Sequence, residues 1–378
     1  RTCFCTDGRS IWNWRLEKVM TIMVGTTKTT PVSAIKPARA MGLQIKGRGV
    51  AKMDVNSARA SILLAIDKVD QTIGAARGWL GGDLNIVVVP EYFLSGYPMG
   101  DTIEGWAEKA GITHDGPEMS GLSAIAQKHQ LYLSGNIYEL DPNFPKIYFQ
   151  SCFILDPTGE CILRYRRMHS MFSPSPWDYW DKYIDLYGMD AVFPVAHTEF
   201  GNLATIASEE IQYPELARAL AFKGAEIFLH STSEIGSPAL TSKDIAKRAR
   251  AFENCAYVVS ANSAGLDGSA VPMNSTDGMS KIVDYTGLVL VEAGYGETMN
   301  ANASIDVNAA RRFRNKPSMS NVLSRTKSEL WANVYSQKSI VTPNALLSTE
   351  PQRSFFIERQ QNVIESLRAA GIFENPAY

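Results

Sequence analysis

Three polar residues of complementary chemistry stand after apolar, strand-like runs in the sequence. Glu91 directly follows "IVVVP", Arg167 closely follows "ECILRY", and Ser208 directly follows "LATIA". In α/β proteins, ligands bind beyond the carboxyl ends of strands. A carboxylate, a cation and a hydroxyl that met there could serve as a base, an anion-binding group and a nucleophile.

Each of these residues alone has an ordinary structural explanation. A carboxylate after a strand is most often a solvated turn residue or a helix cap, and a serine is a common N-cap residue. A pair of arginines such as Arg166 and Arg167 is usually exposed. The evidence for function therefore lies in the combination of the three residues and in the sequence around each.

The three residues lie in blocks that resemble, in the same order, blocks of the nitrilase superfamily of carbon–nitrogen hydrolases. "PEYFLSGY" (90–97) resembles the block of the general-base glutamate, and "DPTGECILRYRRMH" (156–169) resembles the block of the catalytic lysine. "GNLATIASEEIQYPELARALAFKGAEI" (201–227) resembles the nucleophile block, and "RARAFENCAYVVSANSAG" (248–265) a later helix-and-strand segment. The resemblance covers roughly residues 41–305. It implies an α/β fold, the four-layer α-β-β-α sandwich of that superfamily.

The resemblance gives each position a role and also shows two departures from the family pattern. Glu91 falls on the general base, Arg167 on the position of the catalytic lysine, and Ser208 on that of the nucleophilic cysteine. Glu210 falls on the aspartate of the nucleophile block. In the family reaction the nucleophile attacks an amide or nitrile carbon and forms a covalent acyl-enzyme, while the lysine and a backbone N–H stabilise the oxyanion.

The two departures change the chemistry that this resemblance implies. A serine hydroxyl is far less acidic than a thiol of pKa about 8.5, so a glutamate of pKa about 4.3 is a poor base for it unless burial raises that pKa. Arg167 could hold an oxyanion or a substrate carboxylate, or pair with Glu91 and keep it ionised, but it cannot give up a proton. Glu209 and Glu210 add negative charge beside Ser208, which disfavours an alkoxide unless they point elsewhere.

Two functions therefore remain open. The first is a nitrilase-like hydrolase of a small amide-type, non-peptide carbon–nitrogen bond, with Glu91, Arg167 and Ser208 as a Glu-Arg-Ser version of the Glu-Lys-Cys triad. Its substrate would be an amide, a nitrile or a urea-like molecule, with no metal or other cofactor. The alternative is a catalytically inactive protein of the same fold that binds a small ligand or serves in assembly. Because two catalytic positions differ, a naturally divergent branch explains the sequence better than one engineered Cys→Ser change.

Five further residues are weaker candidates for contacts with the substrate. They end a strand, stand beside a catalytic candidate, or belong to an aromatic-rich loop (168–189). That loop is a candidate pocket wall or subunit contact, although core packing explains it equally well. A lone histidine is more often a satisfied structural residue than a ligand. The five are Glu139, His169, Trp177, Glu209 and His230.

The segment between about residues 41 and 305 alternates between helical and strand-like hydrophobic patterns. Apolar residues spaced by four, three and four predict a helix after the candidate caps Asn56 and Ser57; they are Ile62, Ile66, Val69 and Ile73. Further patterns predict strands at 85–90, 131–138, 151–160, 202–208, 225–231, 256–262 and 286–293, and helices at 214–224 and around 245–256. This alternation predicts sheets covered by helices, and hairpin-like pieces at 131–165 favour mixed sheets over purely parallel ones.

Composition limits the classes of function. The 378 residues contain 37 Lys+Arg and 39 Asp+Glu, a net charge of −2, so no electrostatic footprint for nucleic acid or an anionic membrane is visible. Five cysteines without CxxC pairing argue against a disulfide framework or a zinc site and for a reducing compartment. No apolar run approaches the roughly 18 residues of a membrane span. We therefore expect a cytoplasmic protein without a nucleic-acid or membrane partner.

The two ends differ from the body. Residues 1–40 show no clear period and are expected to form a peripheral or disordered leader, with Met20 or Met23 as candidate starts. Residues 306–378 are expected to form a C-terminal extension that becomes amphipathic at 355–367 and packs on the domain or on a neighbouring subunit. The family resemblance implies a homodimer or higher homo-oligomer built through the helical face and this extension.

Overall fold

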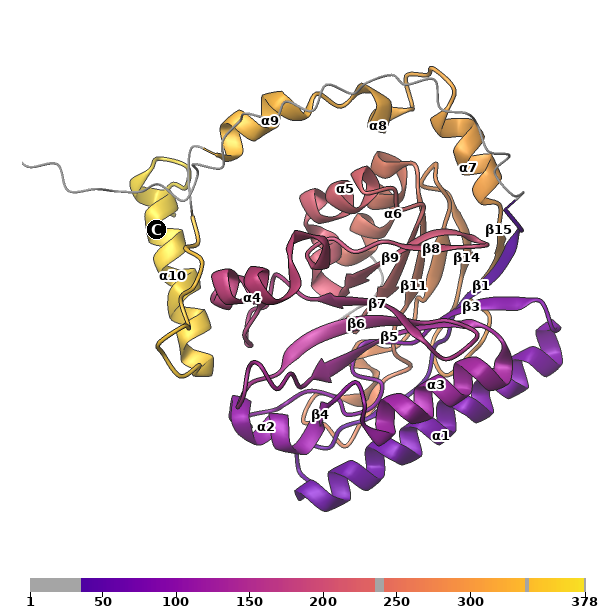
Figure 1. Ribbon diagram of the computed structural model, residues 1–378, viewed down its shortest axis with the longest axis horizontal. Coiled ribbons are helices and arrows are strands. Elements are labelled where there is room, and N and C mark those ends of the chain that lie inside the picture. The colour runs from indigo at the N-terminus through magenta and orange to yellow at the C-terminus, as the bar shows by residue number, and fades with distance from the viewer. Residues whose placement is uncertain (1–34, 235–240, 337–339, 377–378) are drawn as a thin grey trace, which may run out of the picture. The chain divides into compact units, whose positions relative to one another are not determined.

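Two mixed β-sheets lie face to face between two layers of helices in the computed structural model of the chain, which describes residues 35–234, 241–336 and 340–376 (Figure 1). The first sheet has the order β15-β1-β3-β5-β6-β7, with β4 paired to β5. Its strands are β1 (Ala38–Gly42), β3 (Leu84–Val88), β4 (Gly111–Ile112), β5 (Tyr132–Glu139), β6 (Phe149–Leu155), β7 (Cys161–Arg166) and β15 (Asn302–Ile305). Parallel pairs join β1, β3 and β5, whereas β5, β6 and β7 are antiparallel.

The second sheet has the order β14-β13-β11-β10-β9-β8. Its strands are β8 (Ala196–Thr198), β9 (Gly201–Ala207), β10 (Ile227–Ser231), β11 (Tyr257–Ala261), β13 (Lys281–Val283) and β14 (Val289–Glu292). A separate two-stranded pair joins β2 (Gly47–Arg48) to β12 (Leu266–Asp267). The parallel core β9-β10-β11 continues into antiparallel strands on both sides, so the predicted mixed sheets are confirmed.

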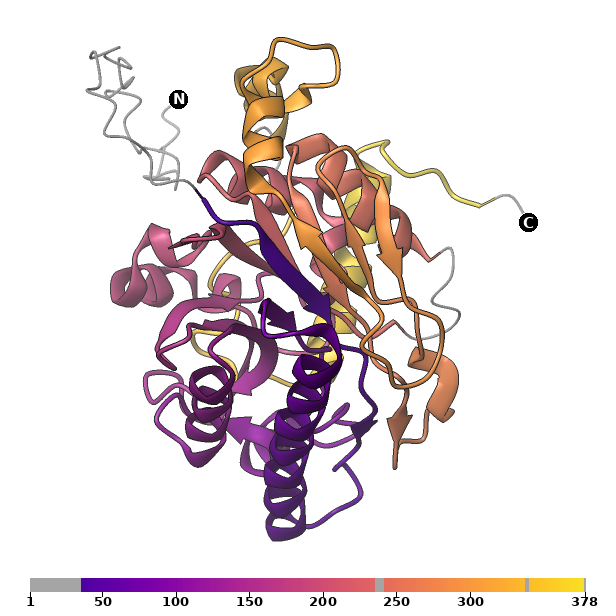
Figure 2. The same ribbon diagram turned by 90° about the vertical axis from the view of Figure 1, so that its right-hand side faces the viewer.

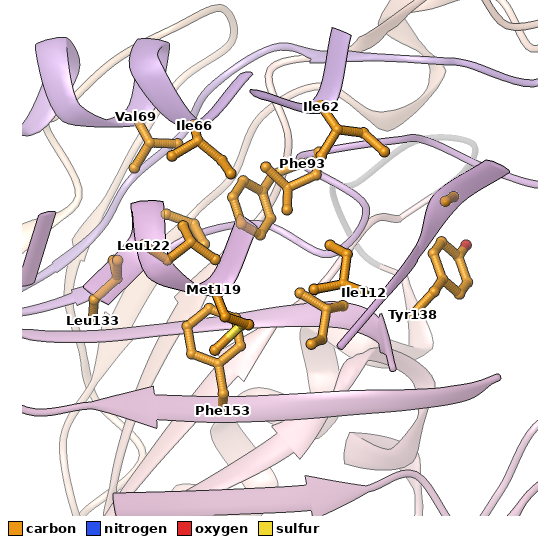
Figure 3. Close-up of a cluster of buried hydrophobic side chains, with 14 of the residues drawn as sticks. Ile62, Ile66, Val69, Phe93, Ile112, Met119, Leu122, Leu133, Tyr138 and Phe153 are labelled. Carbon is orange, nitrogen blue, oxygen red and sulfur yellow. The ribbon is translucent and has the colours of Figure 1, made fainter. Parts of the chain in front are cut away.

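Helices cover the outer face of each sheet. On the first sheet lie α1 (Val55–Leu80) and α3 (Pro117–His129), and on the second lie α5 (Pro214–Phe222) and α6 (Ser242–Asn254). Figure 3 shows Ile66 and Val69 of α1 pointing toward Leu122 of α3, with Leu133 and Phe153 of the first sheet below. The predicted caps of the first helix, Asn56 and Ser57, lie two and three residues too late, because the Asp54 side chain accepts the hydrogen bond that caps α1.

Alternating side chains of one strand divide the core into two clusters. In β3, Ile86 and Val88 pack with β9 and β10 of the second sheet, whereas Val87 and Leu84 pack with α1 and α3. A strand that is buried on both faces reads as a continuous apolar run, which is how this segment appears in the sequence. The layers are therefore helix, sheet, sheet and helix, and the predicted sandwich is confirmed.

The sandwich begins and ends with two paired strands. Ala38 of β1 lies opposite Ile305 of β15 in antiparallel register, so the sheet starts three residues before the expected domain start at residue 41. Of the leader expected at residues 1–40, residues 1–34 lie outside the described residues. Figure 2 shows the same arrangement from the side, with the long helix α1 in the foreground.

The remaining helices lie in connections and in the C-terminal extension. They are α2 (Ile103–Ala110), α4 (Trp180–Tyr187), α7 (Val307–Arg314), α8 (Val322–Arg325), α9 (Ser328–Tyr335) and α10 (Arg353–Ala369). Part of the extension packs on the aromatic-rich loop, since the backbone N–H of Leu346 donates to the carbonyl of Asp178 at 3.1 Å and Phe356 is buried in the first core. No helix of the described residues combines the length and the hydropathy needed to cross a bilayer.

Candidate active site

Strand ends from both sheets bring Glu91, Arg167 and Ser208 to one cavity. Glu91 stands three residues after β3, Arg167 follows β7 and Ser208 follows β9. The three residues are 3%, 5% and 2% exposed, and all three line a cavity of about 520 Å³. A volume of this size lies in the range of small-molecule sites.

Arg167 is the charged link between two carboxylates of the site. Its Nη1 donates to Glu91 Oε1 at 3.1 Å, its Nη2 pairs with Glu209, and its Nε donates to the carbonyl of His169 at 2.6 Å. Burial alone would lower the pKa of Arg167, but the neighbouring Glu209 and Glu91 outweigh it and raise that pKa above its ordinary value. Within the described residues these bonds use three of the five guanidinium N–H groups, so two remain for a ligand.

Glu91 is a buried carboxylate with an increased tendency to hold a proton. Burial raises the pKa of Glu91 above its ordinary value, although Arg167, Lys243 and the Ser208 hydroxyl act in the opposite direction. Its backbone N–H donates to the carbonyl of Thr232 at 3.2 Å, which fixes the segment after β3 to the end of β10. A glutamate is a useful base for a serine only if burial raises its pKa, and Glu91 meets this condition.

Ser208 occupies a sharp turn between β9 and the 3₁₀ turn that follows it. Its φ is 44°, in the left-handed region that non-glycine residues enter at a cost of about 1–3 kcal/mol. His230 holds this turn: its Nε2 lies 2.9 Å from the Ser208 carbonyl oxygen and its Nδ1 lies 2.9 Å from Ser260 Oγ. Burial lowers the pKa of His230 well below its ordinary value, so the ring is neutral, with the Nε2 proton on the carbonyl.

The two glutamates after Ser208 point at partners of their own. Glu209 pairs with Arg167. Glu210 accepts hydrogen bonds from the backbone N–H groups of Met168 and His169, each at 2.9 Å, and its other oxygen accepts the Tyr165 hydroxyl at 2.8 Å. Glu210 therefore braces the segment that carries Arg167. Both carboxylates are bound to groups other than the Ser208 hydroxyl. The condition under which they do not disfavour an alkoxide on Ser208, that they point elsewhere, is therefore met.

Lys243 also reaches this site, and the sequence did not indicate it. Its Nζ lies 2.9 Å from Ser208 Oγ, 3.3 Å from the Ser233 carbonyl oxygen and 3.4 Å from Thr232 Oγ1, and the residue lines the same cavity. Burial lowers the pKa of Lys243, and Glu91 and Glu234 only partly oppose this. The one sequence signal was its position at the start of a helix that follows a buried strand, but a lysine there is usually solvated.

Of the five weaker candidates, only Glu209 lines this cavity. His230 supports the backbone of Ser208, and His169 stacks on Tyr213 with ring centroids 3.9 Å apart. Trp177 donates its indole N–H to the carbonyl of Val341 at 3.1 Å, in the C-terminal extension.

Glu139 lies outside the site because of strand register. Val88, the last residue of β3, pairs with Ser134, so Glu139 lies five residues further along β5, about 16 Å at 3.3 Å per residue. It forms buried ion pairs with Arg166, which is 1% exposed, so the surface location that is usual for an arginine pair does not apply here. These ion pairs lower the pKa of Glu139 although burial alone would raise it.

Apolar and aromatic side chains complete the cavity wall; they include Tyr92, Tyr97, Met99, Tyr148, Phe172 and Val271. The Tyr97 hydroxyl lies 2.6 Å from Ser233 Oγ, and burial raises the pKa of this phenol above its ordinary value. The site thus combines a narrow apolar wall with a hydroxyl, two cations and two carboxylates. Such a combination suits a small neutral molecule that carries one polar group.

Comparison with known sequences points to one family. The family model described as "Carbon-nitrogen hydrolase" matches residues 38–315. A protein named "Probable nitrilase" from Schizosaccharomyces pombe is 28% identical over 61% of this chain and 78% of its own length. A protein named "Formamidase" from Pseudomonas syringae pv. tomato is 31% identical over 62% of this chain, and the aligned part spans 64% of its length.

Solved structures show the same fold at lower identity. The carbon–nitrogen hydrolase from Helicobacter pylori G27 aligns with a TM-score of 0.60 and 20% identity, over 79% of this chain and 99% of its own. Nit3 from Saccharomyces cerevisiae, described as a member of branch 10 of the nitrilase superfamily, aligns with a TM-score of 0.58 and 21% identity, over 75% of this chain and 96% of its own.

Proposed function

Because this chain belongs to the carbon–nitrogen hydrolase family of the nitrilase superfamily, we propose that it hydrolyses the carbon–nitrogen bond of a small, non-peptide amide with Ser208 as its nucleophile. The observation that carries this proposal is that Ser208, Glu91 and Arg167 line one buried cavity at the ends of β9, β3 and β7. A nucleophile, a base and an anion-binding group are the parts that acyl transfer requires.

In the proposed reaction, Ser208 Oγ attacks the amide carbonyl carbon. The two N–H groups of Arg167 that the ion pairs leave free stabilise the oxyanion, and ammonia departs to leave an ester on Ser208. Water then hydrolyses this ester, and the buried carboxylate of Glu91 lines the same cavity. The turn of Ser208, with its positive φ, places this residue in the cavity wall at the end of β9, as a sharp strand-to-helix turn does for the nucleophile of other hydrolases.

The wall of the cavity favours a small substrate. Tyr92, Tyr97 and Tyr148 narrow it, and the volume of about 520 Å³ leaves room for a short acyl group. Relatives named as formamidases support short-chain amides as the first compounds to test. Nitriles and ureas belong in the same panel because they present an electrophilic carbon of similar size.

One observation favours the alternative function, a catalytically silent protein that binds a small ligand. Arg167 pairs with Glu91, which stabilises the ionised carboxylate and weakens it as a base. In this alternative the cavity keeps its shape and charge, but the Ser208 hydroxyl only contacts the ligand.

Ammonia release from a panel of amides, nitriles and ureas tests the proposal. We expect turnover of a short-chain amide by the wild-type chain and a loss of at least about a thousandfold in kcat in Ser208→Ala. Ser366→Ala, an exposed serine on α10, is the matched control. If the wild-type chain is silent but the double variant Ser208→Cys with Arg167→Lys gains turnover, the binding function is correct.

A further inference from the structure

The Ser208 hydroxyl is held by an amine that lies outside the family's catalytic positions. Lys243 Nζ is 2.9 Å from Ser208 Oγ, within the range of a direct proton transfer. Lys243 is the second residue of α6, whereas the position of the family lysine, after β7, is filled by Arg167. The cavity therefore contains an amine, but from the opposite sheet layer.

The two cations of the site differ in what they can do. Arg167 stays charged at any pH the protein survives, and Glu91 is paired with it. A lysine amine can lose its proton when it is buried. The Nζ of Lys243 lies among three oxygen atoms of the cavity wall, and among the residues that the structure describes it forms no ion pair. It is the group at Ser208 Oγ that can exchange a proton without breaking a salt bridge.

We propose that Lys243 is the general base that takes the proton of Ser208, so that the two residues form a serine–lysine dyad inside this fold. This inference rests on the proposed function, which it deepens by naming the proton acceptor. Serine–lysine pairs perform acyl transfer on unrelated folds, so the chemistry needs no further group.

The proton balance of the reaction closes on these two residues. The neutral Nζ accepts the hydroxyl proton as the Oγ–C bond forms and the carbonyl electrons move to oxygen. The resulting ammonium gives this proton to the amide nitrogen, the C–N bond breaks, and ammonia leaves. In the second half a water molecule gives one proton to Nζ as its oxygen attacks the ester. Nζ returns that proton to Ser208 Oγ, and the carboxylic acid departs.

The surroundings of Lys243 lower its pKa below the ordinary value of a lysine, which favours loss of its proton. Burial and the neighbouring Arg167 lower its pKa, whereas carboxylates at the cavity raise it. The groups that face it from the surrounding elements are Glu91, Arg167, Glu209, His230, Glu234 and Lys247. His230 is neutral, and Lys247 is bound to Glu234 at 2.5 Å. The pKa of Lys243 is therefore set mainly by burial, which lowers it, and by Glu91 and Glu234, which raise it, with a smaller lowering by Arg167.

Two variants separate a proton acceptor from a mere positive charge. Lys243→Met removes the amine, and Lys243→Arg keeps a cation that cannot accept a proton at neutral pH. We expect both to lower kcat/KM, and the rate at which a small fluorophosphonate labels Ser208, by at least about a hundredfold. Lys128→Met, an exposed lysine paired with Asp70, should behave as wild type, and Ser208→Ala fixes the site of labelling by mass. If Lys243→Met or Lys243→Arg labels as fast as the wild-type chain, the dyad is wrong.

The pH profile of labelling gives a second readout. If Lys243 is the base, the rate falls as pH drops through its pKa. This fall is the acid limb of the profile. Glu91→Gln then moves the acid limb to lower pH, because it removes a carboxylate that raises the pKa of Lys243. If Glu91 is the base, Glu91→Gln abolishes the limb together with the labelling, and the dyad is overturned.

Labelling and turnover also distinguish the dyad from the proposed function. Labelling of Ser208 that depends on Lys243, without ammonia release from any compound of the panel, supports the dyad and contradicts the amide hydrolase. Ammonia release that survives Lys243→Met supports the hydrolase and contradicts the dyad. A wild-type chain whose Ser208 is never labelled also contradicts the dyad. Carbon NMR of the lysine Cε, with Lys243→Met for the assignment, checks that Lys243 titrates below an ordinary lysine.

Discussion

The ring of His230 holds the backbone of Ser208, the proposed nucleophile: Nε2 donates to the carbonyl oxygen of Ser208 at 2.9 Å. The other ring nitrogen accepts the hydroxyl of Ser260, so this buried imidazole satisfies two polar groups in the second sheet. The turn of Ser208, with its positive φ, depends on this bond because a buried carbonyl needs a donor. Of the two roles that the sequence left open for this lone histidine, a contact with the substrate or a structural support, its hydrogen bonds match the second.

His230 should make the protein less stable in mild acid. Its pKa is lowered in the folded chain, so below about pH 6.5 the unfolded chain binds a proton that the folded chain does not. The free energy of unfolding should therefore fall by about 1.4 kcal/mol per pH unit between pH 6.5 and the folded pKa. Urea unfolding at pH 7.5 and pH 5.5 measures this, and His230→Gln, which keeps a donor, should lose that share of the pH dependence. If the free energy of unfolding depends on pH equally in the wild-type chain and in His230→Gln, the prediction is wrong.

Removing the guanidinium should affect both stability and turnover. Arg167→Gln leaves Glu91 and Glu209 without their cation, which costs about 3–5 kcal/mol for a buried pair and raises the pKa of Glu91 further. The loss of oxyanion donors should lower kcat about a hundredfold or more. Arg167→Lys keeps the positive charge, so its stability and its kcat should lie between those of the wild-type chain and those of Arg167→Gln. Urea unfolding and ammonia release measure both effects; unchanged kcat in Arg167→Gln would remove Arg167 from the oxyanion site.

Glu210 should act on catalysis only through the segment that it braces. Glu210→Gln keeps the shape but loses the charge on which two backbone N–H groups converge, so we expect a loss of about 2 kcal/mol in stability. Because Arg167 directly precedes these N–H groups, kcat should fall moderately, while the pH limb of labelling stays in place. Glu108→Gln, an exposed glutamate on α2, is the control. A shifted pH profile of labelling would contradict a role that is limited to bracing this segment.

The ion pairs of Glu139 should matter for folding and not for turnover. Removing this carboxylate with Glu139→Gln leaves Arg166 buried with only Asp141, so the chain should lose about 3–5 kcal/mol. Because the folded pKa of Glu139 is lowered, its stabilisation is present above about pH 4.5 and is lost as the pH falls below that value. Acid unfolding of both chains tests this. A loss of kcat per folded molecule would place Glu139 in the site after all.

The family resemblance implied the four-layer sandwich, whereas local patterns predicted sheets covered by helices and polar residues at the ends of strands. Apolar runs mark the buried strands before Glu91 and Ser208 and are visible without knowledge of any partner strand. The strand before Arg167, β7, is only partly buried. The cap of the first helix was missed by two residues, since Asp54, Asn56 and Ser57 are all good caps and only the backbone decides among them.

Lys243 and Arg166 could not be predicted because their chemistry depends on partners far away in the sequence. Lys243 meets Ser208 across 35 positions, and Arg166 meets Glu139 across 27, so neither spacing has a local signature. Both residue types are normally solvated, and only tertiary packing reveals that Arg166 is buried and Lys243 partly buried. Glu139 was considered as a substrate contact because it ends a strand, but it lies outside the cavity for a related reason. The end of a strand is visible in the sequence, whereas its register against the neighbouring strand is not.

The antiparallel pairing of β1 with β15 has a consequence for how the chain can be rearranged. Ala38 and Ile305 are direct partners, so the first and last strands of the sandwich are neighbours in space. A short linker could join them, and new termini could open in an exposed turn such as that around Gly159. A circularly permuted chain would then keep the strand pairings of both sheets, but it would have to retain the C-terminal extension, because Phe356 is buried in the first core.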